Sequence, residues 1–388
     1  DACLNPKTLS PKHPFYHLSA AGVVYKFLEY YQEKHQKDFD PKNYLDLAAL
    51  GTIADVMPLI GENRNLVKFG LPLLSAQKRP GLRQLLKQSG FNKPVLSVRD
   101  VAFTIAPRIN AAGRLSHASV SLDLLLSNEE ANVEKIAQKL QRINEKRQIL
   151  GTEILKESIS FWNKDADRKK QAKAIVLSHQ DWHAGIIGIT ASKLVGRFSL
   201  PTVLISDNGE IARGSARTLG NINIYELLKK SQKFFTSFGG HKEAAGFSIT
   251  SKNIPMFINE FSKVCNDLIS TEDLRSIINI DYKLPSEYLT LELAKELEKI
   301  QPFGKGNDPP VFYSNELNAL DFKTVGDGSH LKATFIDKAR KKVINAIGFG
   351  LAEKIELLYK SQVEILFNLT INSWQGSENP ELQLIDIK

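Results

Sequence analysis

The sequence has few cysteines and no long apolar run. Cys3 and Cys265 are the two cysteines among 388 residues, too few for a disulfide framework or a zinc knuckle. No stretch approaches the roughly 18–20 consecutive apolar residues of a membrane span, and the first residues lack the basic-then-apolar pattern of a signal peptide. We therefore expect reduced thiols, a cytoplasmic protein and no membrane partner.

The composition is that of an ordinary globular protein. Hydrophobic residues make up 42% and charged residues 24% of the chain, which is enough apolar content for several cores and excludes wholesale disorder. At roughly 100–200 residues per domain, the length predicts two or three domains. The net charge of +8 is a mild excess that suits either solubility alone or a polyanionic partner.

The hydrophobic spacing changes along the chain. Residues 1–116 are expected to be mostly helical. A capping box at Ser127 and Glu130 predicts the start of one long helix over 127–162, polar on most faces and typical of a helix that bridges two domains. Residues 174–269 then alternate between strand and helix, which indicates an α/β unit with a mixed sheet. Five short β-like runs follow and fit a small barrel of OB type: 311–313, 331–335, 343–349, 363–371 and 382–387.

Asp55 lies in an otherwise apolar run, Gly51–Leu59. A buried carboxylate is costly unless it is paired or bound to a metal, and Mg²⁺ and Mn²⁺ prefer hard oxygen ligands. Asp55 is therefore a candidate metal ligand, although one carboxylate is never a complete site. The alternative is an aspartate that caps a helix before Pro58.

Arg108, Asn110 and Arg114 are grouped in the segment Pro107–Leu115. The small residues among them let a backbone approach a ligand, and the two guanidinium groups flank an amide that both donates and accepts hydrogen bonds. These three residues are candidate phosphate contacts. The alternative is a plain loop before the long helix.

His183 lies where a strand is expected to end and a helix to begin, in the segment His179–Gly188. Backbone N–H groups at such a helix N-terminus bind anions, so His183 is a candidate phosphate contact. The two histidines of this segment could suggest zinc, but no third ligand has a suitable spacing.

Arg213, Ser215 and Arg217 alternate along a predicted strand. Alternate residues of a strand share a face, and two guanidinium groups with a hydroxyl on one face can clamp a phosphate.

Gly239 and Gly240 directly precede His241, and small residues follow at Ala244–Gly246. Glycine frees the backbone for the close approach of a ligand. The alternative is that this segment and the strand with Arg213 and Arg217 both have a purely structural role.

In this order the segments resemble the RecJ family of the DHH phosphoesterase superfamily, over essentially the whole sequence. Gly51–Leu59 looks like the family's fourth metal motif, and Arg108–Leu115 resembles its Arg-x-Asn-Ala-Ala-Gly-Arg segment. Asp181–Gly188, Gly214–Arg217 and Gly239–Gly246 look like the associated DHHA1 domain. Residues from about 275 resemble the RecJ OB domain.

The resemblance implies an α/β multidomain fold. Its expected parts are the C-terminal part of a helical DHH catalytic domain over 1–126, a long connecting helix over 127–163, an α/β DHHA1 domain over 164–272 and a small OB-fold β-barrel over 273–388.

Two motifs of that family, Asp-x-Asp-Gly and Asp-His-His, are missing from this sequence. No two histidines are adjacent, and Asp165-Ala-Asp167 lies in a charged stretch and lacks the following glycine. Because the chain begins at Asp1 rather than Met, we expect a fragment that starts just after the Asp-His-His region and is inactive by itself. A naturally inactive paralogue is the alternative.

By resemblance, the parent protein is a single-stranded-DNA-specific 5′-to-3′ exonuclease of DNA repair and recombination. It releases 5′-mononucleotides by two-metal hydrolysis with Mn²⁺ or Mg²⁺. Asp55 would supply a metal carboxylate, and His241 would touch the scissile phosphate. A clamp on the terminal 5′-phosphate by Arg114, Ser215 and Arg217 would explain the polarity. The other implied single-strand contacts are Arg108, Asn110, His183, Arg213, Gly239 and Gly240.

Two other functions remain open. Related DHH–DHHA1 enzymes cleave short oligonucleotides, but those families generally end at the Gly-Gly-His domain, so residues 275–388 argue against them. The second is a non-catalytic single-strand-binding relative. The family also implies a monomer that binds single-stranded DNA, with a single-strand-binding protein and a RecQ-type helicase as partners.

Overall fold

The computed structural model describes residues 3–35, 38–164, 171–275, 277–337, 339, 341–360, 363–374 and 376–388. Its contacts divide the chain into two compact units. The first unit comprises Asp1–Ala76, Lys93–Ala102 and Ile278–Lys388, and the second comprises Gln77–Asn92 and Phe103–Ile277. The four-part domain division predicted from the sequence stays a prediction. The Asp165-Ala-Asp167 stretch lies outside the described residues.

Helices form the N-terminal part of the first unit. They are α1 (Ala20–His35), α2 (Leu45–Ala54), α3 (Gly61–Ser75) and the single turn α5 (Val98–Asp100). Helix α2 packs against both α1 and α3, and most of its residues are buried. Because little of its side is exposed, α2 can present a polar group to solvent mainly at its ends.

A seven-stranded sheet forms the C-terminal part of the first unit, in the order β6-β7-β11-β12-β10-β9-β8. The strands are β6 (Tyr282–Lys283), β7 (Phe312–Ser314), β8 (Asn318–Val325), β9 (His330–Asp337), β10 (Lys342–Gly348), β11 (Ile365–Trp374) and β12 (Ser377–Ile387), with helix α13 (Leu291–Glu298). Each of the five predicted runs overlaps a strand, and β6 and β8 are additional. Among the described residues no strand pairing joins β6 to β8, so hydrogen bonds do not close this sheet.

The second unit contains a mixed five-stranded sheet in the order β1-β2-β3-β5-β4. The strands are β1 (Ile175–His179), β2 (Thr202–Ser206), β3 (Ile211–Arg217), β4 (Phe235–His241) and β5 (Ala244–Thr250). The β1–β2 pair is parallel, and the other pairs are antiparallel. The predicted α/β unit with a mixed sheet is therefore confirmed.

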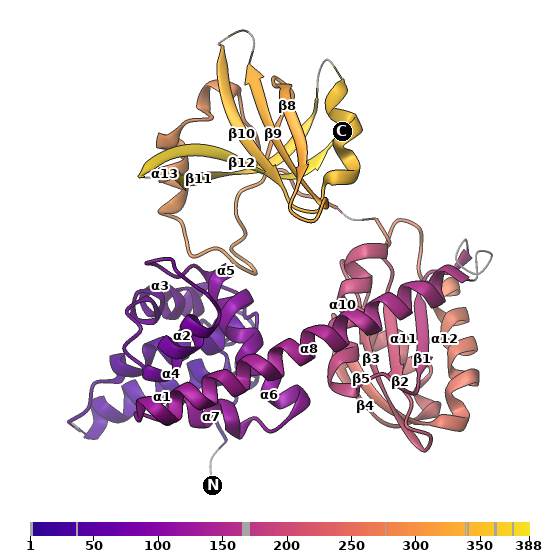
Figure 1. Cartoon of the computed structure of the whole chain (residues 1–388). Helices are drawn as coiled ribbons and strands as arrows, with labels where there is room; N and C mark the ends of the chain where they lie inside the picture. Colours follow the sequence, from indigo (N-terminus) through magenta and orange to yellow (C-terminus); the bar gives the residue numbers. More distant parts are fainter. Residues whose placement is uncertain are drawn as a thin grey trace. The chain divides into compact units, whose positions relative to one another are not determined.

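A separate pair of helices covers each face of this sheet (Figure 1). Helices α11 (Ile224–Lys230) and α12 (Ile254–Leu268) share a core with Val203 and Ala216. Helices α8 (Glu130–Lys164) and α10 (Ala184–Phe198) share a second core with Leu204. Since Val203 and Leu204 are adjacent in β2 and point to opposite faces, the two cores lie on opposite sides of the sheet.

Helix α8 also contacts α4 (Pro80–Gln88), α6 (Ala106–Leu115) and α7 (Ser119–Leu126), so it links these helices to the sheet. The predicted start of this helix is wrong by three residues. Ser127 ends α7, where its N–H donates to the carbonyl of Asp123 (3.0 Å). It therefore does not form a capping box with Glu130, the first residue of α8.

Among the described residues, no helix combines the length and hydrophobicity that crossing a membrane requires.

Candidate functional site

One face of strand β3 carries polar side chains. Arg213, Ser215 and Arg217 alternate with the buried residues Ala212 and Ala216. The buried residues belong to the α11–α12 core, so the three polar residues point to the opposite face, as the sequence alternation predicts.

The strand register extends this polar face across β5 and β4. Ser215 pairs with Gly246, and Gly246 pairs with Gly239. Two residues further along β3, Arg217 pairs with Ala244 of β5, and Ala244 in turn pairs with His241 of β4. Residues in register point to the same side of a sheet, so a basic side chain, a hydroxyl, an imidazole and two bare glycines line one surface.

The two glycines of β4 have different roles. A Cβ added at Gly239 would meet nothing within 4 Å, which leaves exposed backbone open to a ligand. Gly240 has a φ of 155°, and a Cβ there would lie 2.5 Å from the carbonyl oxygen of Ala244. Glycine is therefore required by the fold at position 240, while position 239 is free for a functional role.

His241 is exposed at the end of β4, where its Nδ1 accepts a hydrogen bond from the N–H of Glu243 (3.3 Å). A nitrogen that accepts carries no proton, so the neutral ring holds its proton on Nε2. Nε2 is then available to donate to a ligand oxygen.

Helix α10 begins beside Arg114. His183 is its N-cap, and its Nδ1 accepts a hydrogen bond from the N–H of Gly185 (3.0 Å). A guanidinium nitrogen of Arg114 donates to the carbonyl of Gly185 (3.2 Å). A Cβ at Gly185 would lie 2.4 Å from the carbonyl oxygen of Arg114. Glycine therefore allows α6 and the positive end of α10 to meet.

Gly188 has the same role a turn further along α10. A Cβ at this position would lie 2.7 Å from Nη2 of Arg217 and 2.9 Å from Oγ of Ser215. The absence of a side chain therefore makes room for the polar face of β3 against the helix.

Arg147 and Arg217 each lie near enough to Arg114 for their guanidinium groups to repel it, and we call these three residues the arginine cluster. Burial lowers the pKa of each, and the repulsion between Arg114 and the other two lowers the pKa of Arg147 and Arg217 further. Within the described ranges, no carboxylate forms an ion pair with any of them. Partly dehydrated, mutually repelling guanidinium groups favour a bound anion, because an anion replaces the lost solvation and relieves the repulsion.

Arg147 is not among the site residues that the sequence predicts. It lies on α8, where Leu140, Asn144, Gly151 and Ile154 are buried. Position 147 is three residues after Asn144 and four before Gly151, so it falls on that buried stripe. An arginine on the apolar stripe of an amphipathic helix was a signal available from the sequence.

Arg108 and Asn110 are placed differently on α6. The Nε of Arg108 donates to Gln141 (2.7 Å) and its Nη1 to the carbonyl of Thr104 (2.6 Å). The pKa of Arg108 is lowered, mainly by burial and also by repulsion from Arg147, and the attraction of nearby Glu145 offsets only part of this. Arg108 is thus largely committed to contacts within the protein, whereas Asn110 is exposed.

Asp55 belongs to the first unit. It is the C-cap of α2 and is exposed, so the expectation of a carboxylate buried in an apolar run is wrong, and the alternative of a helix-capping position fits. The carboxylate is exposed because α2 ends at Ala54, one residue before it. A carboxylate at the negative end of a helix is electrostatically unfavourable, and a cation at this position would relieve that cost.

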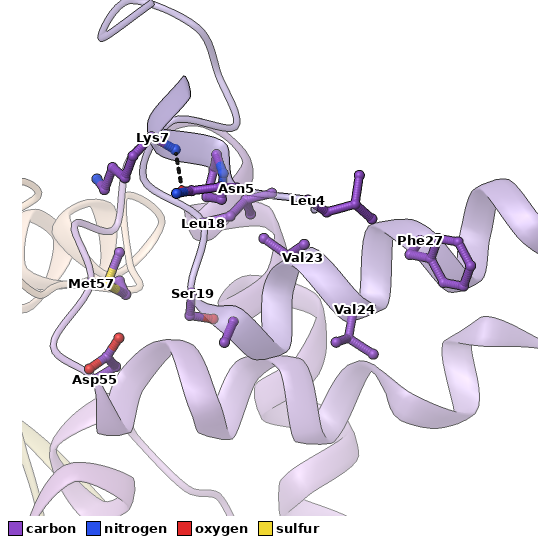
Figure 2. Close-up of a pocket in the computed structure, with 12 residues that line it drawn as sticks. Leu4, Asn5, Lys7, Leu18, Ser19, Val23, Val24, Phe27, Asp55 and Met57 are labelled. Carbon is purple, nitrogen blue, oxygen red and sulfur yellow. Dashed lines mark hydrogen bonds between the residues drawn. The ribbon is translucent and has the colours of Figure 1, made fainter. Parts of the chain in front are cut away.

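The backbone directly after Asp55 is strained. Val56 has a φ of 52°, a conformation that is an outlier for a β-branched residue and is typical of functional sites. Asp55 and Met57 line a pocket of about 660 Å³ together with Asn5, Lys7 and Ser19. Figure 2 shows Asp55 beneath Met57 at one end of this pocket.

A divalent metal ion would find one suitable ligand here. The carboxylate of Asp55 has no hydrogen bond or ion pair in the part of the chain that the structure describes, and Mn²⁺ and Mg²⁺ bind such hard, free oxygens. No group of three or more His, Cys, Asp or Glu residues that could hold a metal occurs among the described residues. Asp55 therefore fits the role of one ligand within a site that needs others.

Comparison with known proteins gives two family matches. Residues 171–267 match the DHHA1 domain, and residues 280–386 match the RecJ OB domain. Single-stranded-DNA-specific exonuclease RecJ of Haemophilus influenzae is 31% identical, over 99% of this chain and 69% of that protein. The Bacillus subtilis protein of the same name is 30% identical over 99% of this chain. The chain spans 48% of the B. subtilis protein's length.

A solved structure agrees with these matches. The crystal structure of RecJ in complex with Mn²⁺ from Thermus thermophilus superposes with a TM-score of 0.81 at 33% identity. The match covers 95% of this chain and 52% of that one. A Mg²⁺ complex of RecJ from the same organism gives a TM-score of 0.79.

Proposed function

The chain belongs to the RecJ family, and on that premise we propose that the protein carrying it is a single-stranded-DNA-specific exonuclease that removes 5′-mononucleotides from the 5′ end. The arginine cluster is the observation that carries this proposal. A terminal phosphate monoester has a charge of about −1.5 to −2 at neutral pH, more than an internal phosphodiester. Three guanidinium groups without a carboxylate partner among the described residues therefore favour the end of a strand over its interior.

Each residue of the site is assigned a separate contact with the DNA. Arg114 and Arg217 hold the terminal phosphate, the Ser215 hydroxyl bonds to one of its oxygens, and Arg147 adds charge. His241 donates from Nε2 to the scissile phosphodiester, since it lies in register with Arg217 two strands away. The remaining proposed contacts to the strand are Arg108, Asn110, His183, Arg213, Gly239 and Gly240.

Asp55 supplies one carboxylate to a pair of Mn²⁺ or Mg²⁺ ions. When bound, these ions supply the positive charge that stabilises an in-line phosphodiester transition state. The other ligands come from the Asp-x-Asp-Gly and Asp-His-His motifs, which this sequence does not contain. Residues 1–388 alone are therefore expected to lack activity.

The match to the RecJ OB domain supports long single strands as substrates, because OB folds bind several nucleotides. We extend the proposal to a monomeric cytoplasmic enzyme of DNA repair and recombination. Its partners would be a single-strand-binding protein and a RecQ-type helicase.

The test is digestion by the full-length protein with Mn²⁺, using single strands labelled at either end, a duplex and a dinucleotide. Stepwise loss from 5′-phosphorylated single strands is expected, with no activity in Asp55→Asn or in residues 1–388 alone. Degradation from the 3′ end, or a preference for the dinucleotide, would overturn the proposal.

A further inference from the structure

A loop far from Asp55 in sequence lies on the segment that carries it. We call Gln301–Asp308 the 301–308 loop and Asp55–Ile60 the post-α2 segment; both belong to the first unit. The N–H of Leu59 donates to the carbonyl of Lys305 (2.7 Å). A Cβ at Gly304 would lie 2.7 Å from Cδ1 of Leu59, so this loop packs against Leu59 without a gap.

The 301–308 loop has its own internal support. Gly304 and Asn307 exchange two backbone hydrogen bonds (3.0 and 2.9 Å). The side-chain nitrogen of Asn307 donates to the carbonyls of Pro302 (2.8 Å) and Ile300 (3.3 Å). Arg64 of α3 donates to the same Ile300 carbonyl (2.5 Å). The loop is thus a closed hydrogen-bonded unit that is tied to the helices of the first unit.

The post-α2 segment needs outside support, because it contains the left-handed Val56. Backbone N–H groups of Asp55, Val56 and Met57 donate to the carbonyls of Gly51, Ile53 and Thr52 in α2 (3.1 Å each). From outside α2, the amide of Asn63 donates to the carbonyl of Pro58 (3.0 Å), and Leu59 donates to the loop. Leu59 is only 2% exposed. A strained backbone persists only where its surroundings over-determine it.

We propose that the 301–308 loop is a positioning element that fixes the post-α2 segment and thereby the orientation of the Asp55 carboxylate. Gly304 and Leu59 are its positioning residues. This inference rests on the proposed function, since it takes Asp55 to be a metal ligand. The loop sets metal affinity without touching metal or DNA, because a ligand must be held within roughly 0.5 Å of its productive geometry.

The experiment uses the full-length protein and the variants Gly304→Ala, Leu59→Ala, their double variant and Asp55→Asn. Gly196→Ala is the matched control, since a Cβ at Gly196 meets nothing within 4 Å. The readouts are Mn²⁺ binding by calorimetry, melting temperature, and single-strand affinity in EDTA.

Gly304→Ala is expected to weaken Mn²⁺ binding about 10-fold or more, the usual effect of losing support behind a metal ligand. Single-strand affinity in EDTA should stay unchanged. Gly196→Ala should keep both its Mn²⁺ affinity and its single-strand affinity, while its melting temperature rises slightly because alanine suits the interior of α10 better than glycine. In the double variant the added methyl group occupies the space that the Leu59 side chain leaves. Its Mn²⁺ affinity should therefore exceed that of Gly304→Ala.

Two results distinguish a failure of the positioning role from a failure of the proposed metal role of Asp55. If Asp55→Asn lowers Mn²⁺ affinity but Gly304→Ala does not, the positioning role is wrong and the proposed function stands. If Asp55→Asn leaves Mn²⁺ affinity unchanged, the proposed metal role of Asp55 fails, and the positioning role fails with it. A Gly304→Ala protein that loses melting temperature and Mn²⁺ affinity together, with no recovery in the double variant, would indicate general destabilisation and also overturn the inference.

Discussion

Gly188 of α10 and Arg217 of β3 are so close that a methyl group at position 188 would lie 2.7 Å from Nη2 of Arg217. Nη1 of the same guanidinium group donates to Oγ of Ser215 (2.9 Å). The missing side chain of Gly188 thus leaves room for Arg217 and Ser215 between α10 and the sheet. The polar face should therefore be sensitive to any side chain at position 188.

Gly188→Ala should displace Arg217 and Ser215. Because a shift of about 1 Å in a binding group can cost roughly 10²-fold in rate, we expect a loss of that order in activity on 5′-phosphorylated strands. Gly196→Ala on the same helix is the control, since its methyl group meets no atom. Equal activity of the two variants would contradict the role of Gly188.

Arg217→Ala should lower activity on 5′-phosphorylated ends by about 10²-fold, the typical cost of removing one preorganised donor. Activity on 5′-hydroxyl ends and Mn²⁺ affinity should change much less. Arg217→Lys should be intermediate, because lysine keeps the charge but loses the planar fork of donors. An equal loss on both kinds of end would argue against a phosphate clamp.

Arg147→Gln should weaken binding of a 5′-phosphorylated oligonucleotide in EDTA by about 10-fold, as expected for one charge-assisted hydrogen bond. The free energy of unfolding of the ligand-free protein should change little. The lost hydrogen bond to Asn144 (3.1 Å) and the lost repulsion from Arg114 oppose each other. Arg142→Gln, at another position of the same helix, is the control for fluorescence anisotropy and melting. Equal binding losses in the two variants would remove Arg147 from the cluster.

Asp55→Asn should stabilise the metal-free protein by about 0.3–1 kcal/mol, because it removes a negative charge from the C-terminal end of α2. The same change should remove Mn²⁺ affinity and activity. Denaturant melts in EDTA and Mn²⁺ calorimetry measure the two effects. A variant that is destabilised and still binds Mn²⁺ would show that the aspartate is structural.

Cys265 should resist alkylation until the protein unfolds. Burial raises the pKa of its thiol from 9.0 to about 12, so at pH 8 the reactive thiolate is about 10³-fold scarcer than at the ordinary pKa. The raised pKa also means that its contribution to stability is complete below pH 9 and is lost as the pH rises toward about 12. Iodoacetamide labelling followed by peptide mass spectrometry tests this against exposed Cys3. Similar labelling of both thiols in the native protein would refute it.

Local patterns in the sequence predicted local structure well. The alternation over Arg213–Arg217 predicted a shared face because the geometry of a strand allows no other arrangement. The start of α8 was misjudged at Ser127, because the same serine can end one helix or begin the next, and packing of α7 decides between them. Asp55 was expected to be buried because apolar neighbours surround it in sequence, yet α2 ends one residue before it.

The sequence by itself determined the order of the motifs, the polar face of β3 and the family resemblance, since each motif consists of residues within a few positions of one another and their order is read directly along the chain. Only the tertiary structure brought Arg147 and Arg217 near Arg114, and Lys305 to Leu59. No periodicity links positions so far apart in the chain. Which of them meet depends on how helices and sheets bury their apolar faces against each other, and that is a property of the whole fold.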